Sequence, residues 1–532
     1  SIPRNHCEKP FVPENEIAET SPTITNAEKL WVAASALLAI ISCVILMSMR
    51  VLSAISFNEP LFVVTSGAEE ESLLSVWRAM QGLEIYLSPS KPPFITSYYN
   101  GIFYHSFGYI TGLALVIFDL EDAWLPTIGR LFALGGATVG AILCFNVLGY
   151  LADPRETPHS RSSWVLRLAI SIFIFYGPLV GFWAISINPE IWATVFTIFA
   201  FWAMLKWYDA FPLRAIAVAS AFSLLAWGFK QSYIFFPLAA GLFLLYRRNW
   251  HGLILLCIIH WAAWACILYF SSDAYRSMLF QLDTENTFAW QQLIRNTSNL
   301  ALKITPIVAA LLIWTVRAPM GRPPFDDWKG HLIIPRTTNM QLVFFGTIAA
   351  ALTIPFSAKV GASENYYFLL TFFLGLYTYV ISVRVLSGAP NRIDAIILSA
   401  GWVANAIAVT AVIIGVTGIS SVRHWNDHHQ KQRACIANLP APYLGFTNLY
   451  TNLPWMHPEP PHIVLAWNYH YDRAAGRSFE GNGIAGQIRR KYFASLVVPT
   501  TSEPIKIDGQ APVGYQVVRR NCAGLDILIR KE

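Results

Sequence analysis

Long apolar runs alternate with short polar loops between about residue 30 and about residue 420. A helix that crosses a bilayer needs about 20 predominantly apolar residues. The pattern therefore predicts a polytopic α-helical membrane protein with about eleven transmembrane helices. The runs lie at residues 30–57, 125–151, 164–187, 190–208, 214–229, 233–246, 252–271, 299–316, 340–356, 366–386 and 394–418.

Two further segments, 69–82 and 93–118, mix apolar and polar positions and lie between the first two runs. They predict interfacial helices that lie along the membrane surface within a first outer loop at 58–124. A second outer loop is expected at 272–298.

Loop charges predict the orientation, because cytoplasmic loops carry an excess of Lys and Arg. One set of alternate loops is basic and the opposite set is acidic. We therefore expect a protein of the cytoplasmic (inner) membrane with a cytoplasmic tail at 1–29 and a transmembrane domain at 30–420. The basic loops lie at 155–167, 206–214, 247–248, 317–336 and 384–392.

The composition becomes polar after about residue 420, and strand-like pieces appear at 463–467, 492–498, 515–518 and 525–529. This region, 421–532, predicts a small α/β domain. About eleven spans from a cytoplasmic tail place it on the periplasmic, extracytoplasmic side. A Cys435–Cys522 disulfide fits such an oxidising compartment, and two unpaired buried thiols are the alternative.

The composition excludes several classes of protein. Only 13% of the residues are charged and 55% are hydrophobic, whereas soluble domains carry about 25% charged residues. A soluble enzyme and a disordered chain are both excluded. The net charge of +6 is modest and spread along the chain, which argues against nucleic acid as a partner.

Three adjacent carboxylates, Glu69, Glu70 and Glu71, open the first short helix of the outer loop. Mutual repulsion raises the pKa of at least one of them, which suits a general base. Such a cluster can also hold a divalent cation such as Mg²⁺ or Mn²⁺, and the sequence leaves open whether a metal is needed. The structural alternative is that acids simply stabilise a helix N-terminus.

Further polar residues follow in the same loop. Lys91, fixed before two prolines, suits a phosphate ligand, and a snorkelling lysine is the alternative. Tyr98, Tyr99 and Asn100 come next, and His105 reads more readily as a packed interfacial histidine than as a catalyst.

Ionisable and polar residues also fall at the outer ends of later helices. Glu190 lies at one such end, Lys230 ends the fifth span, and Lys359, Asn365 and Tyr366 precede the tenth. Each is weak evidence alone, but convergent ionisable groups in membrane segments mark functional sites.

The order of these features resembles the type-C (GT-C) membrane glycosyltransferases, specifically the bacterial relatives of protein mannosyltransferases and of lipid A aminoarabinose transferase. In that family an acidic pair follows the first span, a Gly closes the first interfacial helix, and a Lys-Pro-Pro begins a second. The matching residues here are Glu69-Glu70, Gly82 and Lys91-Pro92-Pro93. The family's carboxylate after the third span and Lys after the fifth match Glu190 and Lys230.

The resemblance implies an inverting transfer of a sugar from a polyprenyl-phosphate donor to a lipid, glycan or protein acceptor on the outer face of the membrane. Glu69 or Glu70 would be the base, and Glu190 would orient the acceptor or share a metal with the glutamates. Aromatic rings near the membrane surface would contact the sugar or membrane lipid. The phosphate would be held by Lys91 and Lys230, with Arg276 or Arg295.

Two other functions remain open from the sequence. One is a transporter or flippase for a lipid or a polar solute, although transporters place their sites near the bilayer midplane. The other is a catalytically degenerate subunit whose C-terminal domain docks a partner protein.

Overall fold

The structure is a computed structural model, and it describes most of the chain. Residues 1–24, 56–67 and 281–287 lie outside the described residues, as do the side chains of Glu70 and Glu71. The described ranges are 25–55, 68–88, 90–151, 161–181, 183–280, 288–317, 335, 337–359, 364–387, 392–416, 419–448, 451–474 and 476–531.

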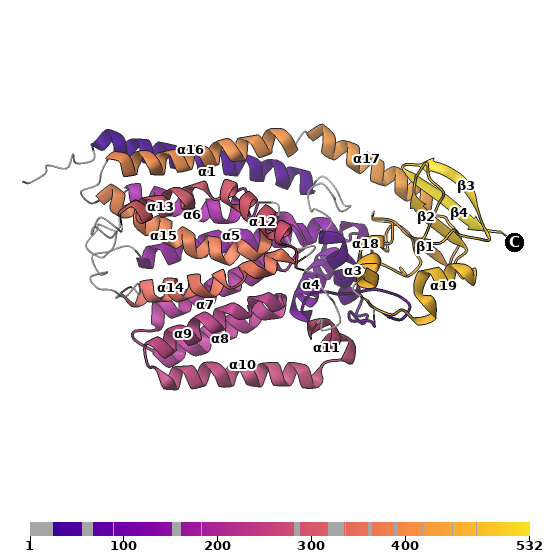
Figure 1. Cartoon of the computed structure of the whole chain (residues 1–532), viewed down its shortest axis with the longest axis horizontal. Coiled ribbons are helices and arrows are strands. Elements are labelled where there is room, and N and C mark those ends of the chain that lie inside the picture. The colour runs from indigo at the N-terminus through magenta and orange to yellow at the C-terminus, as the bar shows by residue number, and fades with distance from the viewer. Residues whose placement is uncertain are drawn as a thin grey trace, which may run out of the picture.

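Long helices run side by side along the long axis of the molecule and form its bundle (Figure 1). Ten of the eleven predicted apolar runs fall mainly on one such helix, and the run at 299–316 covers parts of two helices, Trp290–Lys303 and Thr305–Arg317, that meet at 89°. Eight described helices, among them the shorter helix Gly101–Phe118, are long and apolar enough to cross a membrane, or nine if one bent pair counts as a span, compared with the eleven or so expected from the sequence. The bundle helices are α1 (Asn26–Ile55), α5 (Leu125–Leu151), α6 (Arg161–Tyr176), α7 (Glu190–Trp207), α8 (Pro212–Phe229), α9 (Phe235–Tyr246), α10 (Trp250–Phe270), α13 (Thr305–Arg317), α14 (Thr338–Ala351), α15 (Phe368–Ser387) and α16 (Arg392–Val416).

Small residues let α5 approach its neighbours closely. A Cβ added to Gly140 would lie 2.3 Å from the Phe175 ring of α6, and one added to Gly136 would lie 2.8 Å from the Trp192 ring of α7. Membrane helices commonly use small residues in this way, because close packing replaces the hydrophobic effect between helices.

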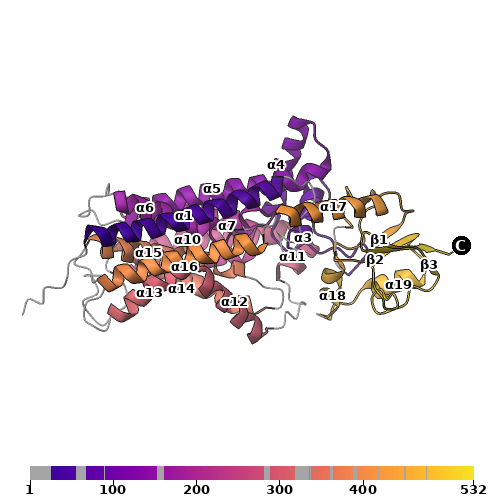
Figure 2. The ribbon, with the colours of Figure 1, turned by 90° about the horizontal axis from the view of Figure 1, so that it is seen from above.

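Shorter helices cross the bundle at one end. They are α3 (Ala68–Met80), α4 (Gly101–Phe118), α11 (Asp273–Phe280) and α12 (Trp290–Lys303). Figure 2 shows α4 and α12 projecting on opposite sides of the bundle. Apolar side chains such as Val116 on α4 and Trp290 on α12 are exposed, as expected of helices that lie at a membrane surface.

The prediction of a second interfacial helix over 93–118 needs correction at its start. The helix begins at Gly101, and residues 94–99 are not helical. The Phe94 side chain packs into the core of the C-terminal domain, and its backbone N–H donates to the carbonyl of His462. These tertiary contacts keep the stretch after the prolines out of the helix.

The C-terminal domain is a small α/β unit joined to the bundle by α17 (Ile419–Ile436). Its four strands lie in the order β1-β2-β4-β3. β1 pairs with β2 in parallel, and β4 pairs antiparallel with β2 and β3. The elements are β1 (Tyr443–Gly445), α18 (Ala466–Ala474), α19 (Gly483–Arg489), β2 (Ser495–Pro499), β3 (Tyr515–Cys522) and β4 (Leu525–Arg530).

Three of the strand-like pieces coincide with β2, β3 and β4, but the piece at 463–467 is not a strand. This segment leads into α18. Its apolar residues, including Ile463, are buried in the domain core but do not pair with a strand of the sheet. A disulfide joins Cys435 at the end of α17 to Cys522 at the end of β3.

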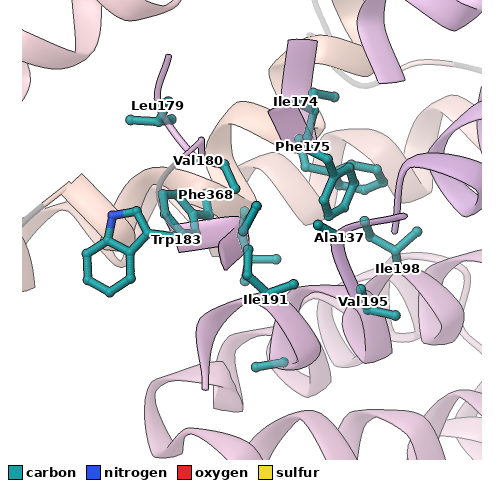
Figure 3. Packing of buried hydrophobic residues seen from close by; sticks show 14 of the residues in the cluster. Ala137, Ile174, Phe175, Leu179, Val180, Trp183, Ile191, Val195, Ile198 and Phe368 are labelled. Atoms are coloured by element: carbon teal, nitrogen blue, oxygen red, sulfur yellow. The ribbon is translucent and has the colours of Figure 1, made fainter. Parts of the chain in front are cut away.

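The connection between α6 and α7 stays inside the protein. Every described residue from Gly177 to Glu190 is buried. Figure 3 shows the apolar side chains that surround this connection, among them Trp183 beside Phe368 of α15; their ring centroids are 5.9 Å apart. The connection is therefore held firmly where it reaches the first residue of α7.

Removing the disulfide should destabilise the C-terminal domain. The two cysteines are 87 residues apart, and a bridge across a loop of that size contributes about 4–5 kcal/mol in the chain-entropy model. We expect Cys435→Ser to lower the midpoint of thermal unfolding in detergent, followed by tryptophan fluorescence. Cys257→Ser, at an exposed free cysteine, is the matched control. An unchanged midpoint in Cys435→Ser would contradict the assignment.

Candidate active site

A buried ion pair lies where three bundle segments meet near the C-terminal domain. Glu190, the first residue of α7, is 0% exposed. Lys230 follows the last residue of α8, and its Nζ lies 2.5 Å from Glu190 Oε1. Asn365, in the connection between α14 and α15, donates from Nδ2 to the same oxygen over 2.6 Å. Three residues from distant parts of the sequence thus form one cluster, the Glu190–Lys230–Asn365 cluster.

Local structure explains why these residue types occupy these positions. A carboxylate at the first residue of α7 is favoured by the positive end of the helix dipole. The Lys230 ammonium lies 5.2 Å from the ring centroid of Tyr366 and 5.7 Å from that of Tyr99. Ring faces attract cations at such distances. The buried ammonium is therefore stabilised by one carboxylate and two aromatic rings.

Two acceptor atoms of the cluster are left over. Glu190 Oε2 and Asn365 Oδ1 are buried, and neither has a hydrogen-bond partner among the described residues. Buried polar atoms are nearly always hydrogen-bonded in native proteins, and exceptions call for an explanation such as a catalytic role. The cluster can accept hydrogen bonds from a ligand that offers O–H or N–H groups.

The polar stretch at 98–100 lies over this cluster. Gln231 Nε2 donates to the Tyr98 carbonyl over 2.7 Å. Asn100 donates to the Trp227 carbonyl at the end of α8 and accepts from the Tyr275 hydroxyl of α11 over 3.0 Å. The stretch is therefore tied to both the bundle and the second outer loop.

Two tyrosines hold the stretch at 98–100 in place. The Tyr86 hydroxyl donates to the Tyr99 carbonyl over 2.8 Å, and the Tyr86 ring meets the Tyr275 ring edge to face at 4.8 Å. Burial raises the pKa of Tyr275 to about 12 and raises the pKa of Tyr86 further. Both hydroxyls therefore remain protonated donors at physiological pH.

The C-terminal domain reaches the same place through α18. Asn468 Nδ2 lies 3.5 Å from the Tyr98 hydroxyl, and Thr96 donates to Asp472 over 2.8 Å. Burial raises the pKa of the Asp472 carboxyl. The domain thus forms part of the wall of the site.

A second buried ion pair lies beside the first. Glu69 is 0% exposed and Arg130 is 2% exposed. Arg130 Nη2 lies 2.8 Å from Glu69 Oε2, and Arg130 Nε lies 3.1 Å from Oε1. The backbone N–H of Ile187 also donates to Oε1 over 3.0 Å. Because Ile187 precedes Glu190 by three residues, which span at most about 11 Å, the two pairs are neighbours.

Not every predicted site residue joins these pairs. Lys91 is exposed beside the C-terminal domain, and His105 is exposed and stacks on a neighbouring tyrosine. Arg276 pairs with an aspartate of its own helix, and Arg295 is exposed on α12. Lys359 is half-buried, and burial lowers its pKa.

The described residues do not fit a metal at the Glu190–Lys230–Asn365 cluster. Glu190 Oε1 already faces an ammonium at 2.5 Å, and a divalent cation there would be repelled by it. Glu69 and Glu190 do not share a site, because each faces its own cation. Among the described side chains, no three metal-ligating residues lie together.

Sequence reasoning missed Arg130, Tyr86 and Tyr275. Arg130 is an ionisable residue inside an apolar run, and such residues are functional candidates by default. That signal was present in the sequence. The two tyrosines carry no comparable signal, because only the fold brings them to Asn100 and Tyr99.

Comparison with solved structures finds archaeal oligosaccharyltransferases. One is AglB from Archaeoglobus fulgidus in complex with an inhibitory peptide and a dolichol-phosphate, at 11% identity and a TM-score of 0.45 over 89% of this chain and 70% of that chain. Another is the oligosaccharyltransferase of the same organism with zinc and sulfate, at 10% identity and a TM-score of 0.46 over 87% and 68%.

These neighbours are glycosyltransferases with the GT-C fold. No protein-family model matches the chain, and no curated relative matches its sequence.

The Glu190–Lys230 pair should behave as a tightly coupled unit. Removing one member of a buried pair leaves an uncompensated charge and costs about 3–5 kcal/mol. We expect Lys230→Met and Glu190→Leu each to lower the free energy of unfolding by that amount, and the double variant to recover most of the loss. A double-mutant cycle by denaturant unfolding in detergent measures this coupling. Additive losses would show that the pair does not form.

Proposed function

We propose that the protein is an inverting glycosyltransferase that moves a sugar from a polyprenyl-phosphate donor to an acceptor hydroxyl on the outer face of the membrane. The observation that carries the proposal is the pair of unpartnered acceptors, Glu190 Oε2 and Asn365 Oδ1, beside a buried lysine. A sugar is a ligand rich in hydroxyl donors, and it would satisfy both atoms.

The ion pair supports a positioning role for Lys230. Its ammonium neutralises Glu190 and faces two rings, so its charge is already compensated. We therefore assign Lys230 to holding Glu190 in place and to shaping the sugar site. This departs from the phosphate-binding role that the family resemblance implies for it.

The described contacts of Glu69 bear on which glutamate is the base. Both carboxylate oxygens of Glu69 accept hydrogen bonds, from Arg130 and from the Ile187 N–H. A carboxylate whose two oxygens are already engaged by such charge-assisted bonds is not free to accept a hydrogen bond from an acceptor hydroxyl. We assign Glu69 to positioning the start of α3, and Glu70, the next residue on that helix, to the role of base.

Lys359 is the cation that we assign to the donor phosphate. Among the described ion pairs it has no carboxylate partner, and burial lowers its pKa. A bound phosphate would favour its charged form and restore the pKa. It also lies in the same connection as Asn365, six residues earlier.

The reaction then proceeds as one displacement. The Glu70 carboxylate takes the proton of the acceptor hydroxyl while the hydroxyl oxygen bonds to the anomeric carbon. The bond from that carbon to the phosphate oxygen breaks, and its electron pair stays on the phosphate, next to Lys359. Attack from the face opposite the phosphate inverts the configuration.

Two features support the proposal that the site faces the extracytoplasmic side of the membrane. The Cys435–Cys522 disulfide belongs to a domain at the same end as the site, and disulfides persist in oxidising compartments. The described basic residues Lys206, Arg214 and Arg247 lie at the other ends of α7, α8 and α9 and favour the cytoplasm. We therefore place the site on the extracytoplasmic side of the cytoplasmic membrane.

A turnover assay tests the proposal. Wild type in nanodiscs should release polyprenyl phosphate from at least one donor in a panel of radiolabelled polyprenyl-phosphate sugars. Glu70→Gln should lower the rate by about 10²–10⁴, the usual cost of losing a general base. Glu71→Gln on the same helix and Glu503→Gln on the exposed surface of the C-terminal domain are matched controls and should stay close to wild type.

The other outcomes separate the alternatives. Loss of turnover in Glu69→Gln with a folded protein, and normal turnover in Glu70→Gln, would transfer the base to Glu69. Failure of wild type to consume any donor would overturn the proposal in favour of a structural subunit, or of a transporter if solute flux appears in proteoliposomes.

A further inference from the structure

Arg50 differs from the other buried basic residues of the protein. Among the described lysines and arginines, three are buried, namely Arg50, Arg130 and Lys230. Arg130 faces Glu69 at 2.8 Å and Lys230 faces Glu190 at 2.5 Å. Arg50 is 7% exposed and takes part in none of the ion pairs of the described chain.

One nitrogen of the Arg50 guanidinium also lacks a hydrogen-bond partner among the described residues. This atom, Nη1, is buried. A guanidinium carries five N–H donors and cannot lose its charge in a protein. Burial of an unpaired charge costs several kcal/mol, so a native protein is expected to compensate it with a bound anion.

The surrounding backbone is shaped to admit this side chain. Arg50 lies near the outer end of α1, against the connection between α6 and α7. A Cβ added to Gly181 would lie only 1.8 Å from Arg50 Nη1. Any other residue at position 181 would displace the guanidinium, so the glycine provides the space in which it sits.

The two buried acids that this connection reaches, Glu69 and Glu190, are already engaged, and the side chains of Glu59, Glu70 and Glu71 lie outside the described residues. The connection that holds Arg50 continues to Ile187, whose N–H binds Glu69, and on to Glu190. Those two carboxylates face Arg130 and Lys230. The anion that Arg50 lacks is therefore expected to come from outside the described chain.

We propose that Arg50 forms an anion site that binds the phosphate group of a membrane lipid. A guanidinium presents its donors in a fork that matches two phosphate oxygens. The site lies near the outer end of a membrane helix, at the level where lipid headgroups lie. The lipid is either polyprenyl phosphate, in which case the inference rests on the proposed function, or a phospholipid.

The first test measures whether substitution of Arg50 raises or lowers the midpoint of thermal unfolding in dodecyl maltoside, a detergent without phosphate. Arg50→Met removes an uncompensated charge, so its unfolding midpoint should equal or exceed that of wild type. Arg130→Met, the contrasting variant, strands Glu69 and should have a lower midpoint. A loss in Arg50→Met as large as that in Arg130→Met would show a carboxylate partner and overturn the proposal.

The second test is binding measured by native mass spectrometry, with undecaprenyl phosphate and phosphatidylglycerol as separate probes. Wild type should retain at least one of them, and Arg50→Met should bind it about 10–100-fold more weakly, as expected for loss of a charge-assisted bond. Arg50→Lys should lie between the two. Equal retention by wild type and Arg50→Met would overturn the proposal.

The two lipids distinguish the source of the phosphate. Preference for undecaprenyl phosphate assigns the site to the lipid carrier of the reaction, and retention of phosphatidylglycerol assigns it to the surrounding membrane. Glu70→Gln separates this inference from the proposed function, because it should lose turnover and keep Arg50-dependent binding. Arg50-dependent binding in a protein that consumes no donor would support the lipid site and contradict only the transferase.

Discussion

A carboxylate buried at the end of a membrane helix must be paired, and the pairing of Glu190 with Lys230 organises this protein. The ion pair joins the start of α7 to the end of α8, and Asn365 adds the connection before α15. A single misplaced segment would leave a buried charge without its partner, at a cost of several kcal/mol. The geometry of the site is therefore tied to the stability of the bundle.

The cost of burying an unpaired charge also explains which charged residues hold the structure together and which are available to a ligand. Glu69 with Arg130, and Glu190 with Lys230, are neutral pairs that hold backbone segments in place. Among the buried atoms without a partner in the described chain are Glu190 Oε2, Asn365 Oδ1 and Arg50 Nη1, and these are available to a ligand. Chemistry is expected at such unsatisfied atoms, because satisfied ones have little to gain from a substrate.

Much of the architecture could be predicted from the sequence, because the bilayer imposes a simple rule on apolar length. Ten of the eleven predicted runs fall mainly on one helix, and the sequence also points to Glu190, Lys230 and Asn365 as polar residues at helix ends. Their mutual contact depends on how the helices pack, and no periodicity reveals it. The segment after Lys91 is not helical because Phe94 packs into a domain more than 300 residues later in the chain. Arg130 was overlooked although it stood in an apolar run.

The most direct test of the account is a cryo-EM structure in nanodiscs with a phosphonate analogue of a polyprenyl-phosphate sugar that cannot be cleaved. The account predicts a sugar hydroxyl within hydrogen-bond distance of Glu190 Oε2 or Asn365 Oδ1, with the Glu190–Lys230 pair intact and the phosphonate beside Lys359. A sugar bound elsewhere, or a Lys230 that leaves Glu190 to contact the phosphonate, would contradict it.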